Sequence, residues 1–353
     1  MKTLTYDHIN NPFILRMGNY NIIEHDYSKD YFTLETVNGE NFTDLTFKVP
    51  SQVTSTDVAS ISYSIDNGNS WTTVENESGI TISINNVNKV LFKGDAKQFT
   101  TASDNYGNNS SHFETRHLIN VYGNIMSLFY GDDFTDKTEF PEGSSKNLLR
   151  FFNTNYQGWQ LSCPIREAKN LILPATTLTS KCYESLFCYN PYLISTPKLP
   201  ATTLAESCYG YMFGSCYGLT KAPELPATTL ANYCYSSMFT DCHSLTKAPE
   251  LPATTLASNC YNSMFESCYS LTKAPELPAT TLASNCYSNM FKACKSLKYI
   301  KMMATTNVSE NNLDTWTRYV YPIGTFVKNS AAEWDITGWS GVPDNWTVVT
   351  ADA

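Results

Sequence analysis

The sequence LPATTLASNCYNSMFESCYSLTKAPE, which runs from Leu251 to Glu276, is the clearest of five copies of one phrase in the second half of the chain. Its opening LPATTL recurs every 26 residues, and the copies begin at Leu173, Leu199, Leu225, Leu251 and Leu277. A fixed period of about 20 to 50 residues is typical of solenoids, in which each unit buries its apolar face against its neighbours. We therefore predict a repeat solenoid over residues 173–300.

Each unit is predicted to contain a short helix followed by an extended segment. In the copy that begins at Leu225, the apolar residues follow the spacing i, i+1, i+4, i+5 and i+8, and they are Cys234, Tyr235, Met238, Phe239 and Cys242. This spacing favours one face of a helix over residues 231–241, with Thr228 and Thr229 as candidate caps for its first amides. Residues 245–251 predict a short strand, in which Pro249 has no amide hydrogen to donate.

Stacking of the units would place equivalent residues in columns with a spacing of about 4.8 Å. Two columns should be buried, and they consist of Leu225, Leu251 and Leu277, and of Met212, Met238, Met264 and Met290. Two columns should be exposed, with Lys221, Lys247 and Lys273 in one and Glu224, Glu250 and Glu276 in the other. These charged columns either screen each other's like-charge repulsion or form a rim that binds a partner.

The eleven cysteines favour a buried role over disulfides or a metal site. Their number is odd, and ten of them belong to the repeats, where two cysteines of one unit lie eight residues apart, as Cys260 and Cys268 do. Free cysteine packs as a small apolar residue. No CxxC pair is present, and His243 replaces Tyr or Lys in a single unit, so the sequence indicates no zinc ligand set. We expect no metal and no cofactor.

The segments before the repeats differ in character. Residues 1–28 are polar and Asn-rich, apart from Phe13, Ile14 and Leu15. They are either a loose leader or an arm that anchors the chain to a partner. Residues 29–122 alternate apolar and polar residues in short runs that are separated by Asn-Gly turns, which predicts a β-sandwich-like domain. The hairpin SIDNGNSW, residues 64–71, resembles the Asp-box of sialidases, a folding device whose Asp and Gly shape the turn above a packed Trp.

Both ends of the solenoid are expected to carry caps. Residues 123–172 contain a degenerate repeat, which predicts the N-terminal cap because terminal units of solenoids are atypical. Residues 301–353 lose the 26-residue period and contain Trp334, Trp339 and Trp346, which we expect to cover the last coil. The predicted fold class is α+β, with a β-sandwich-like domain, a solenoid of leucine-rich type and a C-terminal cap.

Composition excludes several functions. The net charge is −9, and there is no Lys/Arg cluster, so we expect no nucleic acid partner. No stretch approaches the roughly 18 to 20 apolar residues of a membrane helix, and residues 1–20 show no export signal, so we expect no membrane insertion. The chain also shows no Ser/His/Asp set, no paired carboxylates on one element and no Gly-rich phosphate loop. We therefore predict a protein that is not an enzyme.

The repeat phrase and its flanking segments together resemble a known family. The phrase is LPATTLA, then Cys-Tyr, Met-Phe, Cys, SLT and APE, and the flanks are residues 63–71, 123–128, 324–334 and 342–348. Over residues 30 to 350 the chain resembles the BspA-like leucine-rich repeat proteins of gut Bacteroides and their phages. The resemblance implies a leucine-rich repeat fold and a binding or adhesion role, and it does not name the ligand.

The absence of a visible export signal favours one location over another. A phage protein assembles in the host cytoplasm, whereas a surface adhesin must cross a membrane. We therefore expect a virion-associated fibre, decoration or host-recognition protein that binds a protein or glycan on a bacterial surface. Residues 1–28 would then contact capsid or tail proteins through Phe13, Ile14 and Leu15. The alternative is a bacterial cell-surface adhesin.

Overall fold

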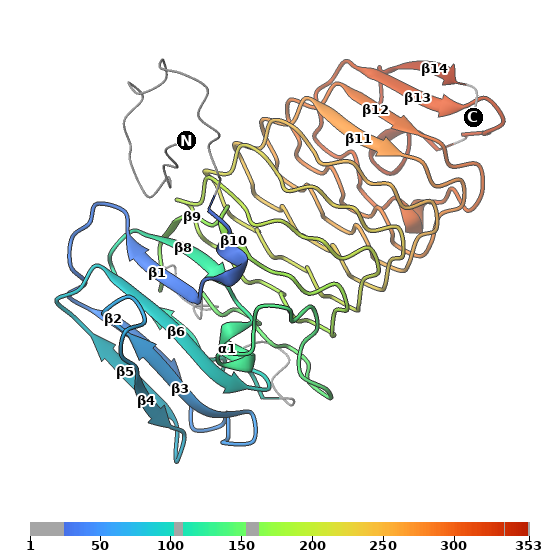
Figure 1. Cartoon of the computed structure of the whole chain (residues 1–353). Helices are drawn as coiled ribbons and strands as arrows, with labels where there is room; N and C mark the ends of the chain where they lie inside the picture. The colour runs from blue at the N-terminus through green and yellow to red at the C-terminus, as the bar shows by residue number, and fades with distance from the viewer. Residues whose placement is uncertain (1–24, 102–108, 153–161, 335, 352–353) are drawn as a thin grey trace, which may run out of the picture.

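A computed structural model describes residues 25–101, 109–152, 162–334 and 336–351 of the chain. The N-terminal half forms two β-sheets, and a solenoid extends away from them to a four-stranded parallel sheet near the C-terminus (Figure 1). The predicted solenoid is therefore confirmed. Phe13, Ile14 and Leu15 lie outside the described residues.

Alternating apolar residues build the two N-terminal sheets. The larger sheet contains β1 (Phe32–Thr36), β3 (Val58–Ser64), β4 (Thr72–Glu75), β6 (Lys89–Ala96), β8 (Ile119–Asn124), β9 (Ile165–Glu167) and β10 (Leu171–Ile172). The smaller contains β2 (Leu45–Val49), β5 (Ile80–Ile84) and β7 (His112–Glu114). Phe47 of β2 lies 6.1 Å from Phe92 of β6, measured between ring centroids, and Phe113 of β7 lies 5.9 Å from Phe32 of β1. The two sheets therefore share one aromatic core.

The hairpin between β3 and β4 has the architecture that its Asp-box-like sequence predicts. The carboxylate of Asp66 accepts hydrogen bonds from the amide of Ser70, at 2.9 Å, and from its hydroxyl, at 2.6 Å. These bonds lower the pKa of Asp66 to about 2. Gly68 has a φ of 87°, which glycine adopts without strain. Trp71 packs edge-on against Tyr31, with their ring centroids 4.8 Å apart. The carboxylate therefore has a structural role in the turn.

The N-terminal sheets and the solenoid are hydrogen-bonded to each other. Strands β9 and β10 both pair in parallel with β8, so the first extended segments before the repeats belong to the larger sheet. One turn earlier, the amide of Leu148 donates to the carbonyl of Cys182 at 2.9 Å. Phe152 stacks on Phe187 with centroids 5.4 Å apart. The residues expected to cap the solenoid thus stack directly on its first unit.

The predicted helix in each repeat is wrong. In its place the chain forms consecutive turns, in which every second amide donates to the carbonyl three residues back, as Met238 does to Tyr235 at 3.2 Å. The amides between them donate to the next unit, as Phe239 does to Met264 at 2.9 Å. In this unit the residues with positive φ are Tyr233, Ser237 and Asp241. Among the described residues, the one α-helix is α1 (Ser127–Tyr130).

The period of the apolar residues explains this difference. Spacings of i, i+1, i+4, i+5 and i+8 repeat every four residues, whereas an α-helix repeats every 3.6. Turns that reverse in a four-residue cycle direct two residues inward and two outward, so Tyr235 and Phe239 are both buried. A helix would use all its amides internally, and none would remain to join the neighbouring coil. The apolar spacing therefore predicts which residues are buried, but the backbone at these residues forms consecutive turns and not a helix.

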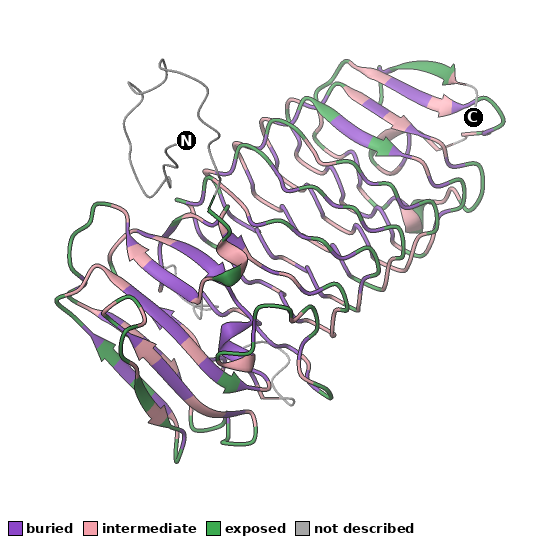
Figure 2. Ribbon diagram, in the orientation of Figure 1, coloured by how far each residue is buried: buried purple, intermediate pink, exposed green. Residues whose placement is uncertain are grey.

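Translation from one coil to the next stacks identical rings on one another. The five tyrosines of one ladder have neighbouring centroids 5.8 to 5.9 Å apart, and they are Tyr183, Tyr209, Tyr235, Tyr261 and Tyr287. A phenylalanine ladder contains Phe187, Phe213, Phe239, Phe265 and Phe291. The predicted leucine and methionine columns are also buried, which confirms the assigned register. Figure 2 shows buried residues along the inner side of successive coils.

In four of the five units, the second cysteine forms a hydrogen bond between coils. Cys242 donates its Sγ hydrogen to the carbonyl of Phe213 at 3.1 Å, and Cys268 donates to Phe239 at 3.2 Å. A thiol is a weak donor, but here it adds a contact to a buried carbonyl without bringing a strongly polar group into the core. All eleven cysteines are buried, as expected for core residues, and none of them forms a disulfide.

The solenoid ends in a regular parallel sheet. Its strands are β11 (Lys273–Leu277), β12 (Tyr299–Met302), β13 (Thr325–Asn329) and β14 (Thr347–Ala351). Short 3-10 helices lie at η1 (Tyr27–Lys29), η2 (Glu310–Asn312) and η3 (Gly338–Ser340). Trp316 continues the phenylalanine ladder, with its ring 6.0 Å from that of Phe291. Of the three expected capping tryptophans, Trp346 is buried and Trp334 packs near Trp316, whereas Trp339 is 53% exposed.

Substitution of Leu251 by alanine should destabilise the fold. Leu251 is 4% exposed, and its removal would leave a cavity between two stacked units. We expect a loss of about 2 to 5 kcal/mol in the free energy of unfolding, measured by chemical denaturation. The exposed Thr254 of the same unit provides the control, because Thr254→Ala should change stability by less than about 0.5 kcal/mol. Equal effects of the two substitutions would contradict the register.

Candidate functional site

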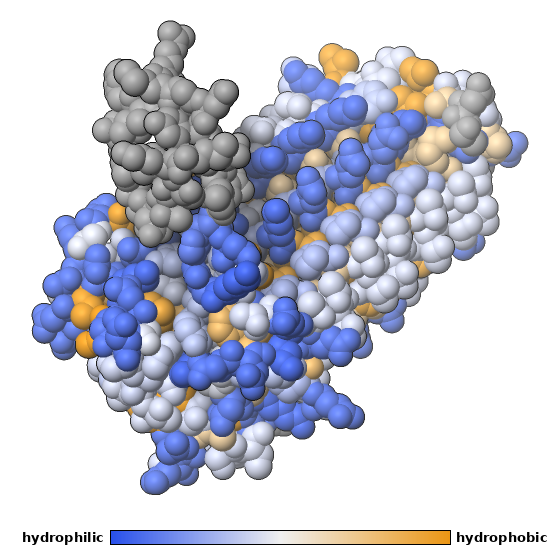
Figure 3. Space-filling model, in the orientation of Figure 1, coloured by the Kyte–Doolittle hydropathy of each residue, from blue (hydrophilic) through white to orange (hydrophobic). Residues whose placement is uncertain are grey.

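The extended segments of the repeats carry the two charged columns that the sequence predicts. The strand predicted over residues 245–251 is not formed, and among the segments that carry the columns only β11 is a strand. We call Lys221, Lys247 and Lys273 the lysine column, and Glu224, Glu250 and Glu276 the glutamate column; all six residues are exposed. Lys221 and Lys247 form a parallel bridge, and Lys273 begins β11. The predicted alignment of the lysines is therefore present. Figure 3 shows hydrophilic residues that follow one another from coil to coil along the solenoid.

Few of these charges are neutralised by neighbours. Glu276 forms an ion pair with Lys301, at 3.2 Å between Nζ and Oε2. The Nζ of Lys273 lies 4.9 Å from the centre of the Tyr299 ring. The other four members of the two columns form no ion pair with any described residue. Direct pairing between the columns therefore does not account for their alternation, and most of these charges remain accessible to a partner.

A third column of side chains, half-buried to exposed, runs along the solenoid. Tyr217, His243 and Tyr269 stack with centroid distances of 4.7 and 4.4 Å and interplanar angles of 16° and 13°. Lys295 continues the column, with its Nζ 4.7 Å from the centre of Tyr269. We call these four residues the aromatic column. Their 26-residue spacing is visible in the sequence, but the stacking of His243 between two tyrosines is decided by the tertiary structure.

The aromatic column and the lysine column are close in sequence along each coil. Only three residues separate Tyr269 from Lys273, and the buried Leu271 is one of them. Because the rings of the aromatic column are stacked face to face, a partner would contact their edges and polar atoms and not their faces. Aromatic side chains are enriched where proteins bind their partners, whereas lysine is depleted at the centre of such interfaces, whose rim is polar. The two columns together form one extended, repeated surface.

A second exposed aromatic cluster lies near the C-terminal end. The guanidinium of Arg318 lies over Tyr319, at 4.6 Å from its ring centre, and over Trp339, at 4.3 Å. The two rings are 54% and 53% exposed. The Nζ of Lys298 lies 4.3 Å from the ring centre of Tyr321. This cluster has the same combination of cations and aromatic rings as the repeat surface.

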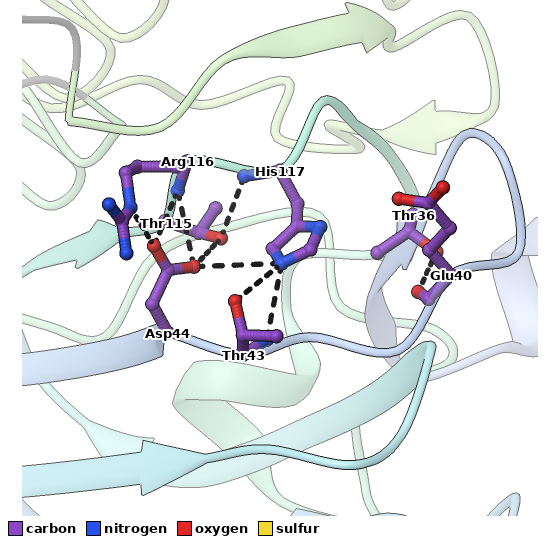
Figure 4. A network of polar contacts seen from close by, with 7 residues as sticks. All are labelled: Thr36, Glu40, Thr43, Asp44, Thr115, Arg116 and His117. Carbon is purple, nitrogen blue, oxygen red and sulfur yellow. Dashed lines mark hydrogen bonds and ion pairs between the residues drawn. The ribbon is translucent and has the colours of Figure 1, made fainter.

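A polar network beside the N-terminal sheets includes His117 (Figure 4). Its Nε2 accepts a hydrogen bond from the amide of Thr43 at 3.2 Å and lies 3.0 Å from the Thr43 hydroxyl. The same nitrogen lies 3.9 Å from Oδ1 of Asp44. In a catalytic relay, the histidine uses one nitrogen for the carboxylate and the other for the nucleophile. Here every contact is to Nε2, so the arrangement is that of a structural clamp.

Asp44 fixes the other side of this clamp. Burial raises the pKa of its carboxyl, but hydrogen bonds from Arg116 and Thr115 outweigh that effect and hold the pKa below its usual value. The Nε of Arg116 donates to Oδ2 at 2.7 Å, and the Thr115 hydroxyl donates to Oδ1 at 2.9 Å. In the same region, the hydroxyl of Thr36 donates to the carbonyl of Glu40 at 2.6 Å. These contacts tie the loop before β8 to the loop before β2.

In the described part of the chain, no group of three or more His, Cys, Asp or Glu side chains is arranged to hold a metal ion. None of the helices in that part is long and apolar enough to cross a membrane. Comparison with known proteins finds no matching family model, no matching curated protein and no matching solved structure.

The repeat cysteines should be unreactive in the folded protein. Burial raises the pKa of Cys182, Cys234 and Cys286 to about 12, so the nucleophilic thiolate is scarce at neutral pH. We expect a thiol reagent at pH 8 to label almost no cysteine until denaturant is added, and then to label all eleven. A Thr254→Cys variant, whose new thiol is exposed, should react at once. Rapid labelling of several native thiols would contradict the burial.

Proposed function

We propose that this protein is a non-enzymatic binding or adhesion protein whose repeat surface recognises a protein or glycan on a bacterial surface. The observation that supports this most directly is the register of the lysine column, whose exposed charges recur on successive coils. Like charges held close together destabilise a fold slightly and confer no packing advantage. A partner with matching negative groups would compensate this cost.

We further propose that the repeat region is a leucine-rich repeat of BspA-like type, and that the two N-terminal sheets form a sandwich. The resemblance of the repeat phrase supports the first point. The second is supported by the shared aromatic core, in which Phe47 and Phe113 of the smaller sheet meet Phe92 and Phe32 of the larger. The turn segments between Cys208 and Cys216 and their equivalents would then form the side of the solenoid opposite the lysine and glutamate columns.

A virion is the location that we propose for this protein, with residues 1–28 as the anchor to capsid or tail proteins. A bacterial cell-surface adhesin is the alternative. In both settings the repeat surface would face outward toward a cell surface.

The test compares phage particles that are assembled with the full chain and with a chain lacking residues 1–28. Loss of the truncated protein from purified particles is expected, and its retention would contradict the anchor.

Neutralisation of the lysine column should weaken binding. A variant with Lys221→Gln, Lys247→Gln and Lys273→Gln would remove three positive charges and keep the side-chain length. We expect saturable binding of the labelled wild-type protein to intact Bacteroides cells, and about tenfold weaker binding of the variant, because three exposed charges together contribute about 1.4 kcal/mol. The measurement is fluorescence of washed cells across a concentration series.

The matched control changes the net charge by the same amount on the exposed threonines of the same units. It carries Thr202→Glu, Thr228→Glu and Thr254→Glu, and we expect it to bind as the wild type does. Equal weakening by both variants would mean that total charge, and not the lysine column, governs binding. Unchanged binding of the lysine variant would contradict the proposed surface.

A further inference from the structure

The last strand of the solenoid presents an unpaired edge. Strand β14 is the terminal strand of its sheet and pairs in parallel with β13 alone. The amide of Thr347 donates to Gly324, and the carbonyl of Ala351 accepts from Ser330, so these two residues direct their backbone groups toward β13. Because direction alternates along a strand, Val348 and Thr350 direct theirs away from it. No described strand lies on that side.

This edge lacks the features that usually protect one. Natural edge strands carry charges, prolines or bulges that prevent further pairing. β14 reads Thr-Val-Val-Thr-Ala and pairs with β13 in unbroken register. Val348 is 47% exposed and Val349 is 44% exposed, although they point to opposite faces of the sheet. Figure 2 shows β14 as an exposed strand at the far end of the solenoid.

The other end of the solenoid cannot accept such an edge. There, β9 and β10 already pair with β8 of the N-terminal sheet. Units therefore cannot extend the solenoid head to tail by pairing β14 of one copy with the first strand of the next. Pairing of β14 with another sheet edge of a second copy, such as that of β4, would leave β14 of the second copy open, whereas β14 against β14 is a contact of one surface with itself and closes as a two-fold dimer.

We propose that β14 pairs antiparallel with β14 of a second copy of this chain, with Val349 on the two-fold axis. Val348 then lies opposite Thr350 of the partner, and the two residues exchange both backbone hydrogen bonds. Val349 lies opposite its own equivalent, in the closely spaced type of pair whose backbone groups face away from each other. The strand has no charged side chain, so the symmetric register opposes no like charges.

The dimer has a consequence for recognition, although it does not depend on the proposed function. It would place two repeat surfaces in one particle, and two sites that engage one cell surface together bind more tightly than either site alone. The pairing rests on the strand geometry alone, so it can hold even where the lysine column proves to have no role in binding.

Two kinds of variant test the pairing on the full chain. Thr350→Pro removes an amide that points away from β13, so the monomer should keep its fold while the outward hydrogen bond is lost. Sedimentation of the wild type should show a concentration-dependent monomer–dimer equilibrium. The proline variant should be monomeric, and the Thr350→Ser control, which keeps the amide, should dimerise as the wild type does. A wild type that is monomeric at every concentration, or a proline variant that still dimerises, overturns the proposal.

Single cysteines test the register independently. Val349→Cys would place two thiols opposite each other at a Cα separation of about 4.5 Å, which a disulfide can span. Val348→Cys would place each thiol opposite Thr350. Under mild oxidation we expect a covalent dimer from Val349→Cys and little from Val348→Cys, while the buried native cysteines stay unreacted. Equal cross-linking of both variants, or none of the Val349→Cys variant, overturns the antiparallel register.

Discussion

The alternation of backbone hydrogen bonds within each turn segment is the constraint on which the solenoid depends. One amide closes a turn on its own coil, and the next, such as that of Phe239, joins the neighbouring coil. Every coil is thereby held at the same offset from the last. Backbone polar groups in a buried segment must find partners, and this arrangement provides them without helix or regular sheet.

The fixed offset then dictates what the side chains can do. Equivalent tyrosines and phenylalanines must stack, and their rings are within 12° of parallel through the five full units. Positions that cannot tolerate a void keep residues of similar volume, which explains why Met recurs in four of the five units and the first unit has Leu186. The cost is left-handed backbone at every fourth residue, of which Tyr233, with a φ of 58°, is an example.

The same translation also organises the surface. It places Lys221 in register with Lys247, and it stacks His243 between two tyrosines. A partner would therefore meet repeated groups at a regular spacing, and could gain affinity by contacting several units. At the N-terminal end, the strands that precede the repeats pair with β8. At the C-terminal end, the outer edge of β14 pairs with no described strand. This asymmetry arises because Trp316 and Trp346 fill the interior of the last coils without covering the strand edge.

The sequence alone determined the period of 26 residues, the buried leucine, methionine and cysteine positions, the hairpin around Asp66 and the alignment of the lysine column. Each follows from local spacing, because a repeated unit must bury the same face every time. The conformation of residues 231–241, the stacking of His243 and the open edge of β14 were decided by the tertiary structure. A four-residue apolar period suits a helix nearly as well as consecutive turns. Only hydrogen bonds to the neighbouring coil, which lies 26 residues away in sequence, select the turns.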